Sequence, residues 1–157
     1  MKYLWGFYVA FDIIVAMEKI IFVCHGSICR SPAAEWIMKS LTNKFEVCSR
    51  AVSFEEIGND IYPPMKIELK RRRIKFEPHS ASRITHSNYD SADYIFYMDE
   101  SNKRYLDEMF ADIKGKILPI YYFSPSIKEI EDPWYTGNFK KVCDQIEQCC
   151  KDIIKNI

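Results

Sequence analysis

The chain has 157 residues, of which 48% are hydrophobic, 15% aromatic and 28% charged, and its formal net charge is zero. This length fits a single domain with a sizeable core. The balanced charge gives no support to a nucleic-acid-binding protein or to one that binds an acidic membrane surface. No apolar stretch is long enough to predict a transmembrane helix, so we expect no stable membrane insertion.

The chain begins with an aromatic and apolar stretch over residues 1–16. It makes a poor signal peptide, because Asp12 interrupts its apolar part and no clear cleavage site follows. Met17 stands just before the first predicted strand and is a second candidate for the functional start. We expect residues 1–17 to form an N-terminal extension without a catalytic role, in preference to a secretion signal.

Apolar runs predict strands over residues 19–23, 45–52, 94–98 and 117–122. Apolar residues recur at helical spacing over residues 32–41, 64–73, 100–110 and 138–154. This alternation favours a three-layer α/β fold, in which a four-stranded parallel sheet carries helices on both faces. Ligand sites of such sheets lie beyond the carboxyl ends of the strands.

The first predicted strand runs directly into the sequence C-H-G-S-I-C-R-S-P, residues 24–32. Ser31 and Pro32 fit the N-cap and the first turn of the next helix. Backbone N–H groups of such a loop, together with a helix N-terminus, bind phosphate oxygens, and Arg30 can bind two of these oxygens at once. The same positive field favours the thiolate form of Cys24, a nucleophile for in-line attack on phosphorus. The pattern predicts a phosphate-binding catalytic loop.

Cleavage of a phosphate ester also needs an acid that protonates the leaving oxygen. Asp132 is the candidate, because it follows the fourth predicted strand and Pro133 restricts it to extended backbone. Asp99 follows the third predicted strand and should lie at the same edge of the sheet. Trp134 and Tyr135 could then form aromatic walls for a ring-bearing substrate. Taken alone, the same residues would fit an ordinary Asp-Pro turn with aromatic core residues.

Three of the six cysteines fall within the last 15 residues, in a helical pattern where buried thiols are expected. The arrangement lacks the spacing of a disulfide-rich secreted domain and favours a reducing, cytoplasmic location. Cys24 and Cys29 could form half of a zinc site, but no second pair at ligand spacing follows. We therefore expect no metal and no cofactor.

Together, these motifs resemble those of the low-molecular-weight protein tyrosine phosphatases. Residues 24–32 match the family loop C-x-G-N-x-C-R-S-P, with a serine at the asparagine position. Residues 132–137, D-P-W-Y-T-G, are similar to the family's acid loop D-P-Y-Y-G with one extra residue. Residues 78–84 and 93–102 also match the family. Several spaced motifs in the same order make the resemblance specific.

The resemblance implies one phosphatase domain over residues 18–157, which hydrolyses phosphotyrosine and aryl phosphates through a phosphocysteine intermediate. Cys24 would be the nucleophile, Arg30 would bind the phosphate and the transition state, and Asp132 would be the general acid. Cys29 would form a reversible disulfide with Cys24 under oxidation, which makes the enzyme redox-regulated. The implied partners are phosphotyrosine proteins or small aryl phosphates, and we expect a monomer that binds no nucleic acid.

The resemblance also implies a supporting set around the nucleophile. Ser31 would donate a hydrogen bond to the thiolate, and the residues that support the loop would be Ser49, His79 and Asp99. The phosphate-binding set comprises His25, Gly26, Ser27, Ile28, Cys29, Arg30 and Ser31. The substrate-pocket set comprises Phe54, Trp134 and Tyr135.

Two positions depart from the family pattern, and a third aligns in either of two registers. Ser27 replaces an asparagine, which tolerates left-handed backbone better than serine, so the stiffness of the loop is in question. His25 replaces a usually apolar residue at the pocket mouth, and it is either an exposed polar side chain or a residue with a role in protonation or specificity. The aromatic residue that borders the family's pocket aligns with either Phe54 or Glu55.

Two alternatives to a phosphatase were weighed. A related arsenate reductase would need further cysteines downstream, and residues 79–123 contain none. A phosphotyrosine-binding module without turnover would need neither Cys24 nor Asp132, and both are present. The phosphatase is therefore the favoured interpretation.

Overall fold

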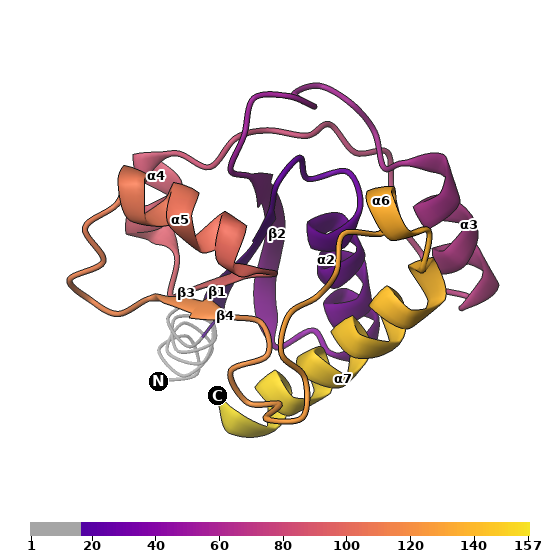
Figure 1. Ribbon diagram of the computed structural model, residues 1–157. Coiled ribbons are helices and arrows are strands. Elements are labelled where there is room, and N and C mark those ends of the chain that lie inside the picture. The colour runs from indigo at the N-terminus through magenta and orange to yellow at the C-terminus, as the bar shows by residue number, and fades with distance from the viewer. Residues whose placement is uncertain (1–16) are drawn as a thin grey trace, which may run out of the picture.

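The computed structural model describes residues 17–157, which form a four-stranded parallel sheet between two layers of helices (Figure 1). The strands are β1 (Glu18–Cys24), β2 (Phe45–Ala51), β3 (Tyr94–Tyr97) and β4 (Ile117–Pro119). Their order in the sheet is β2-β1-β3-β4, and each neighbouring pair is parallel. The predicted three-layer α/β fold is confirmed. The expected N-terminal extension lies outside the described residues, Met17 excepted.

The helices of the described residues are α2 (Arg30–Leu41), α3 (Pro63–Arg71), α4 (His86–Ser91), α5 (Glu100–Met109), α6 (Pro133–Thr136) and α7 (Phe139–Asn156). Helices α2, α3 and α7 lie on one side of the sheet, and α4 and α5 lie on the other (Figure 1). Within residues 17–157, no helix combines the length and the apolar character needed to cross a membrane.

Strand β1 is central and is buried on both faces. Ile20 and Phe22 belong to the hydrophobic cluster formed with α2, α3 and α7, whereas Ile21 and Val23 belong to the cluster that contains Leu106 of α5. Successive side chains of a strand point to opposite faces, so a strand covered on both sides must be apolar throughout. Each of these side chains stabilises the fold by about 1.5–3 kcal/mol on burial. Cys24, which ends this strand, is therefore held on a rigid element.

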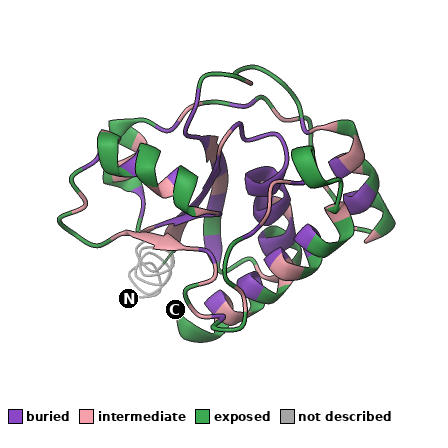
Figure 2. Cartoon of the chain, viewed as in Figure 1, coloured by how far each residue is buried: buried purple, intermediate pink, exposed green. Residues whose placement is uncertain are grey.

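Helix α7 confirms the amphipathic helix predicted at the end of the chain. Its buried side chains are Val142, Cys143, Ile146, Cys149, Cys150 and Ile153. Exposed positions cover its outer face (Figure 2). Burial raises the pKa of Cys143 to about 12 and that of Cys149 to about 11. These thiols stay protonated at neutral pH and pack as small apolar side chains.

Several boundaries differ from the sequence prediction. Helix α2 begins at Arg30, and its N-cap is Cys29 rather than the predicted Ser31. The Ser31 hydroxyl lies inside the loop after β1 instead of capping the helix. Strand β4 ends at Pro119, because the chain turns there and the Tyr122 N–H donates back to the Pro119 carbonyl. The short helices α4 and α6 were not predicted.

Candidate active site

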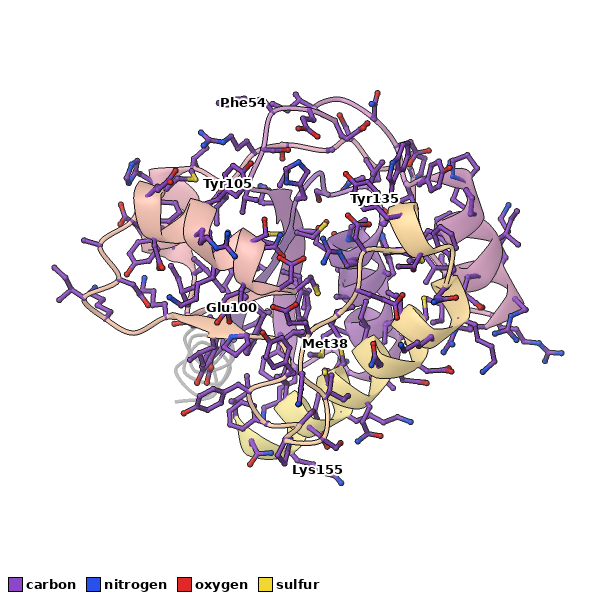
Figure 3. The ribbon with its side chains drawn as sticks, in the orientation of Figure 1. Met38, Phe54, Glu100, Tyr105, Tyr135 and Lys155 are labelled. Atoms are coloured by element: carbon purple, nitrogen blue, oxygen red, sulfur yellow. The ribbon has the colours of Figure 1, made fainter. Side chains whose placement is uncertain are left out.

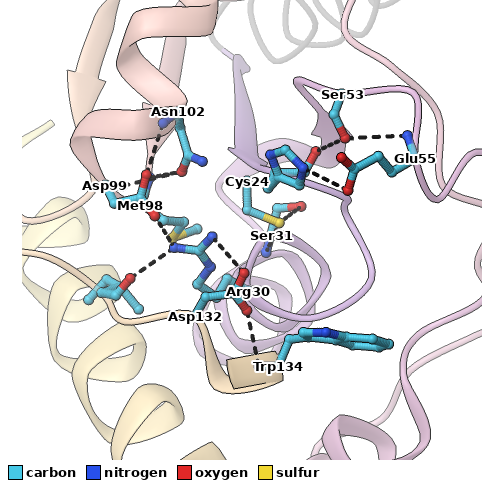
Figure 4. Close-up of polar contacts among 12 residues, drawn as sticks. Cys24, Arg30, Ser31, Ser53, Glu55, Met98, Asp99, Asn102, Asp132 and Trp134 are labelled. Carbon is cyan, nitrogen blue, oxygen red and sulfur yellow. Dashed lines mark hydrogen bonds and ion pairs between the residues drawn. The ribbon is translucent and has the colours of Figure 1, made fainter. Parts of the chain in front are cut away.

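A pocket lies at the carboxyl edge of the sheet, where β1 ends (Figure 4). Three segments far apart in the sequence line it: the loop after β1, the loop after β2, and the start of α6. The lining residues are Cys24, His25, Gly26, Ile28, Cys29, Arg30, Glu55, Glu56, Asp132, Trp134 and Tyr135. Parallel strands end at a shared edge, so the fold brings the two predicted catalytic segments together.

The sulfur of Cys24 is buried at the N-terminus of α2. The Ser31 backbone N–H donates to Cys24 Sγ at 3.4 Å, whereas Cys24 Sγ donates to Ser31 Oγ at 3.3 Å, the reverse of the predicted donation from the Ser31 hydroxyl. Ser31 Oγ also donates to Ser27 Oγ at 2.9 Å. Hydrogen-bond donors at a helix N-terminus stabilise a thiolate. The Ser31 backbone N–H therefore favours a nucleophilic sulfur at the position where the sequence predicted one.

Ser27 adopts left-handed backbone, with φ of 56°. Residues other than glycine, asparagine and aspartate rarely do so, so this departure from the family pattern falls at a strained position. Its carbonyl oxygen accepts a hydrogen bond from His79 Nε2 at 2.6 Å. The backbone N–H of His79 is itself held by Asp60 Oδ1 at 3.0 Å. His79 thus contacts the loop directly, where the prediction placed it.

The Arg30 guanidinium is buried and is oriented by three acceptors. Nη1 donates to Asp99 Oδ2 at 2.6 Å and to the Ile130 carbonyl at 2.9 Å, while Nη2 donates to Asp132 Oδ2 at 3.4 Å. Burial alone would lower the pKa of Arg30, but the negative charges of Cys24, Asp99 and Asp132 raise it. The guanidinium therefore stays charged and fixed beside the nucleophile (Figure 4).

Asp99 is positioned by the start of α5. Its Oδ1 accepts from the Asn102 N–H at 2.9 Å, and Asn102 Oδ1 accepts from the N–H groups of Met98 and Asp99. This reciprocal capping leaves Oδ2 directed at Arg30. Both carboxylate oxygens of Asp99 are engaged, which suits a residue that orients Arg30 rather than one that donates a proton.

Asp132 faces the loop from the N-terminus of α6. Its backbone is extended, with φ of −82° and ψ of 110°, as the following proline predicts. Oδ1 accepts from the Trp134 N–H at 3.0 Å, and Oδ2 accepts from Arg30. The side chain is 26% exposed, so it can exchange a proton with water. Its position beside the guanidinium and its access to solvent suit a general acid.

The neighbouring carboxylate Glu131 is a poorer candidate. Hydrogen bonds from Lys141, Thr136 and Asn138 lower the pKa of Glu131 to about 2. Such a group carries no proton at neutral pH and cannot protonate a leaving oxygen. Asp132 lines the pocket and Glu131 does not, so Asp132 is the better-placed acid of this adjacent pair.

Aromatic side chains form the wall beside Asp132. Trp134 is half exposed and packs against Tyr62, with ring centroids 4.6 Å apart. Tyr135 is 83% exposed and also lines the pocket (Figure 3). Ile28 contributes an apolar surface from the loop. The apolar surfaces of these side chains are suited to contact the ring of an aromatic substrate.

Phe54 and Ser49 do not lie where the sequence predicted them. Phe54 is 68% exposed, and its ring centroid lies 4.2 Å from the Arg83 guanidinium carbon. Glu55 lines the pocket instead of Phe54. The backbone bends after β2, so consecutive residues of this loop point in different directions. Ser49 donates to the buried Glu35 Oε1 at 2.7 Å, so it supports α2 rather than the phosphate loop. Glu55 was the alternative to Phe54 in the alignment, and Glu56 was not predicted as a lining residue.

Cys29 lines the same pocket. Burial, together with the negative charge of Cys24, raises the pKa of Cys29, so its thiol stays protonated at neutral pH. The loop therefore holds two different cysteines. Cys24 Sγ accepts a hydrogen bond from the Ser31 backbone N–H, and the Cys29 thiol stays protonated. In the part of the chain that the structure describes, no three His, Cys, Asp or Glu residues gather as a metal ion would require.

The sequence matches known phosphatases over nearly the whole described region. Residues 19–157 match the family described as low molecular weight phosphotyrosine protein phosphatase. The chain is 34% identical over 151 residues to the low molecular weight protein-tyrosine-phosphatase YfkJ of Bacillus subtilis, covering 90% of this chain and 96% of that protein. It is 36% identical over 152 residues to the Gallus gallus low molecular weight phosphotyrosine protein phosphatase, covering 88% and 95%.

Solved structures share the fold. The low molecular weight protein tyrosine phosphatase from Streptococcus pyogenes superimposes with a TM-score of 0.82 at 34% identity, covering 90% of this chain and 93% of that chain. The YwlE arginine phosphatase from Geobacillus stearothermophilus gives a TM-score of 0.78 at 25% identity, covering 88% and 91%.

Proposed function

The chain belongs to the low-molecular-weight phosphotyrosine protein phosphatase family, and on this premise we propose that it hydrolyses phosphotyrosine and other aryl phosphates through a phosphocysteine intermediate. The observation that carries the proposal is the convergence of Cys24, Arg30 and Asp132 on one pocket. A nucleophile, a cation that binds oxyanions and an acid are the three groups that the reaction needs.

In the first step, Cys24 Sγ attacks phosphorus in line with the leaving oxygen. The S–P bond forms as the P–O bond to the tyrosine breaks, and Asp132 transfers its proton to the departing phenolate oxygen. Arg30 and the loop N–H groups bind the phosphoryl oxygens, where charge develops in the transition state. Nη1 of Arg30 is committed to Asp99 and Ile130, so Nη2, with its longer 3.4 Å contact, is the group expected to turn to the phosphate.

In the second step, a water molecule attacks the phosphocysteine. Asp132, now deprotonated, accepts a proton from this water, and the S–P bond breaks to return Cys24 as a thiolate. The Ser31 backbone N–H, which donates to Cys24 Sγ at 3.4 Å, stabilises that leaving thiolate. The same carboxyl therefore serves as the acid in one step and as the base in the next.

The pocket walls favour an aromatic substrate. Trp134, Tyr135 and Ile28 offer apolar surface for a phenyl ring beside the phosphate cradle. One of the structural neighbours is named an arginine phosphatase, so phosphoarginine is the appropriate competing substrate.

The test compares p-nitrophenyl phosphate, phosphotyrosine and phosphoarginine with wild type and with Cys24→Ser. Wild type should hydrolyse both aryl phosphates, and Cys24→Ser should retain phosphate binding without turnover. Turnover near the wild-type rate in Cys24→Ser would refute the assignment of Cys24 as the nucleophile. Faster hydrolysis of phosphoarginine than of phosphotyrosine would overturn the substrate class.

Reversible redox control is the second part of the proposal. A peroxide oxidises the Cys24 thiolate to a sulfenic acid, and the protonated Cys29 thiol then condenses with it, forming a disulfide and releasing water. The pKa of Cys29 is raised by burial, so Cys24 should react first. We further propose that the enzyme is a cytoplasmic monomer. Its cysteines lack the spacing of a disulfide-rich secreted domain, and this pattern supports the cytoplasmic location.

A further inference from the structure

The side of the pocket mouth that faces the loop after β2 is ionic rather than aromatic. Glu55 and Glu56 both line the pocket there, and Asp132 lies across it. Among the lining residues of the described chain, Arg30 is the one Lys or Arg, and it is paired with Asp99 and Asp132. The mouth therefore carries more negative than positive charge, although the reacting group is a phosphate.

His25 fixes Glu55 at this mouth. Its Nε2 lies 2.9 Å from Glu55 Oε2, and its carbonyl oxygen accepts from both the N–H and the hydroxyl of Ser53, at 3.0 and 2.9 Å (Figure 4). The His25 ring also makes an edge contact with Tyr105 of α5, with centroids 5.7 Å apart. The side chain of Glu55 remains 69% exposed, so its carboxylate is held in place yet is accessible to a ligand.

Glu56 is fixed against the phosphate loop itself. A Cβ at Gly26 would lie 2.9 Å from Glu56 Cγ, so the stem of Glu56 packs on the glycine backbone. Glu56 Oε2 accepts a hydrogen bond from Asn59 Nδ2 at 2.6 Å. The absence of a side chain at Gly26 thus allows a second acidic side chain to pack against the loop after β1.

We propose that Glu55 and Glu56, with His25 as the positioning residue, make this enzyme prefer phosphotyrosine that is flanked by lysine or arginine. The inference rests on the proposed function and deepens it. A lysine or arginine next to the phosphotyrosine would be attracted by these carboxylates, because the separation is within the Debye length at physiological salt. A flanking aspartate or glutamate would be repelled. A positive charge on His25 would cancel at most one of the carboxylates at the mouth.

The experiment measures kcat/KM for two peptides that are identical except for their flanks, with two lysines or two glutamates on each side of phosphotyrosine. Each exposed charge pair contributes weakly and several act together, so we expect wild type to prefer the lysine peptide by about tenfold at low salt. Glu55→Gln and Glu56→Gln should each reduce this ratio about two- to threefold. Glu55→Lys should reduce it further, and about 0.5 M salt should compress it in every variant.

The matched control is Glu108→Gln, the same change at an exposed position of α5 that does not line the pocket, and it should keep the wild-type ratio. His25→Ala should lower the ratio in the wild-type background and have little further effect in Glu55→Gln, because it acts through Glu55. Independent, additive effects of the two changes would overturn the positioning role of His25.

Two outcomes would overturn the inference while the proposed function stands. One is equal kcat/KM for the two peptides in an active wild-type enzyme. The other is a lysine preference that survives unchanged in both glutamine variants. Loss of turnover on both peptides and on p-nitrophenyl phosphate would instead reject the proposed function.

Discussion

Replacing Asp132 by asparagine separates proton donation from loop structure. Asp132 Oδ1 accepts the Trp134 N–H at 3.0 Å and caps α6, and an asparagine side-chain oxygen can make the same bond. The substitution therefore keeps the cap, whereas Asp132→Ala loses it at a cost of about 1 kcal/mol. Asp132→Asn should therefore leave the thermal stability unchanged, whereas Asp132→Ala should lower it slightly.

The size of the rate loss follows from the chemistry of the leaving group. A positioned general acid contributes about 10²–10⁴ in rate, equivalent to about 3–5 kcal/mol of transition-state stabilisation. Asp132→Asn should lose this much in kcat with phosphotyrosine, whose leaving oxygen needs a proton. The loss should be much smaller with aryl phosphates whose phenols are strongly acidic, because such leaving groups depart without protonation.

The assay is a series of aryl phosphates of graded leaving-group acidity, with kcat measured for wild type, Asp132→Asn and Asp132→Ala. The dependence on leaving-group acidity should be shallow in wild type and steep in both variants. A uniform loss across the series would refute the role of Asp132 in proton transfer. Asp99 and Glu131 would then be tested, although the contacts of Asp99 with Arg30 and the low pKa of Glu131 argue against both.

Other substitutions test the remaining parts of the site. Arg30→Lys should abolish turnover in steady-state assays, because a point charge cannot reproduce a two-pronged contact with phosphate; near-normal kcat would contradict this. Cys29→Ser should recover much less activity than wild type after peroxide followed by dithiothreitol, and equal recovery would show that Cys29 does not protect Cys24. His79→Ala, which removes the 2.6 Å bond to the Ser27 carbonyl, should weaken inhibition by inorganic phosphate and lower Tm, as measured by titration and thermal melting; unchanged phosphate affinity would contradict a role in holding the loop. A chelator should leave the rate unchanged.

The parts of the fold that the sequence predicted are those with strong periodic signals. The run Ile20 to Val23 and the stripe of α7 are long and regular, and both elements are confirmed. Helices α4 and α6 span six and four residues, too few for a helical period to appear. Thr85 and Asn88, which form the capping box of α4, were the one readable signal for it.

The site residues also divide into those that the sequence predicted correctly and those that it did not. Cys24, Arg30 and Asp132 stand in compact motifs, so their meeting in one pocket could be predicted once the strands were placed. Ser31 was wrong as an N-cap, because its hydroxyl is used by Cys24 and Ser27 inside the loop. Such competition between partners depends on three-dimensional contacts that residue preferences do not contain.

The loop after β2 was the hardest part to predict. Phe54 was expected in the pocket from the family resemblance, in which it aligned in one of two registers with Glu55, but the direction of a side chain in an irregular loop follows local backbone turns. Glu55 and Glu56 lie on the same loop, and exposed charged residues carry no periodic signal. Only the coordinates show which of these three consecutive side chains faces the phosphate loop.

The most direct test of the account is to trap the covalent intermediate. Wild type is mixed with a saturating aryl phosphate, quenched in acid during turnover, digested and mapped by mass spectrometry. The account predicts a phosphoryl group on the peptide that contains Cys24, attached to Cys24 itself, with a rapid release of about one phenol per enzyme before the steady state. A phosphoryl group on His25 instead, or full turnover in Cys24→Ser, would contradict it.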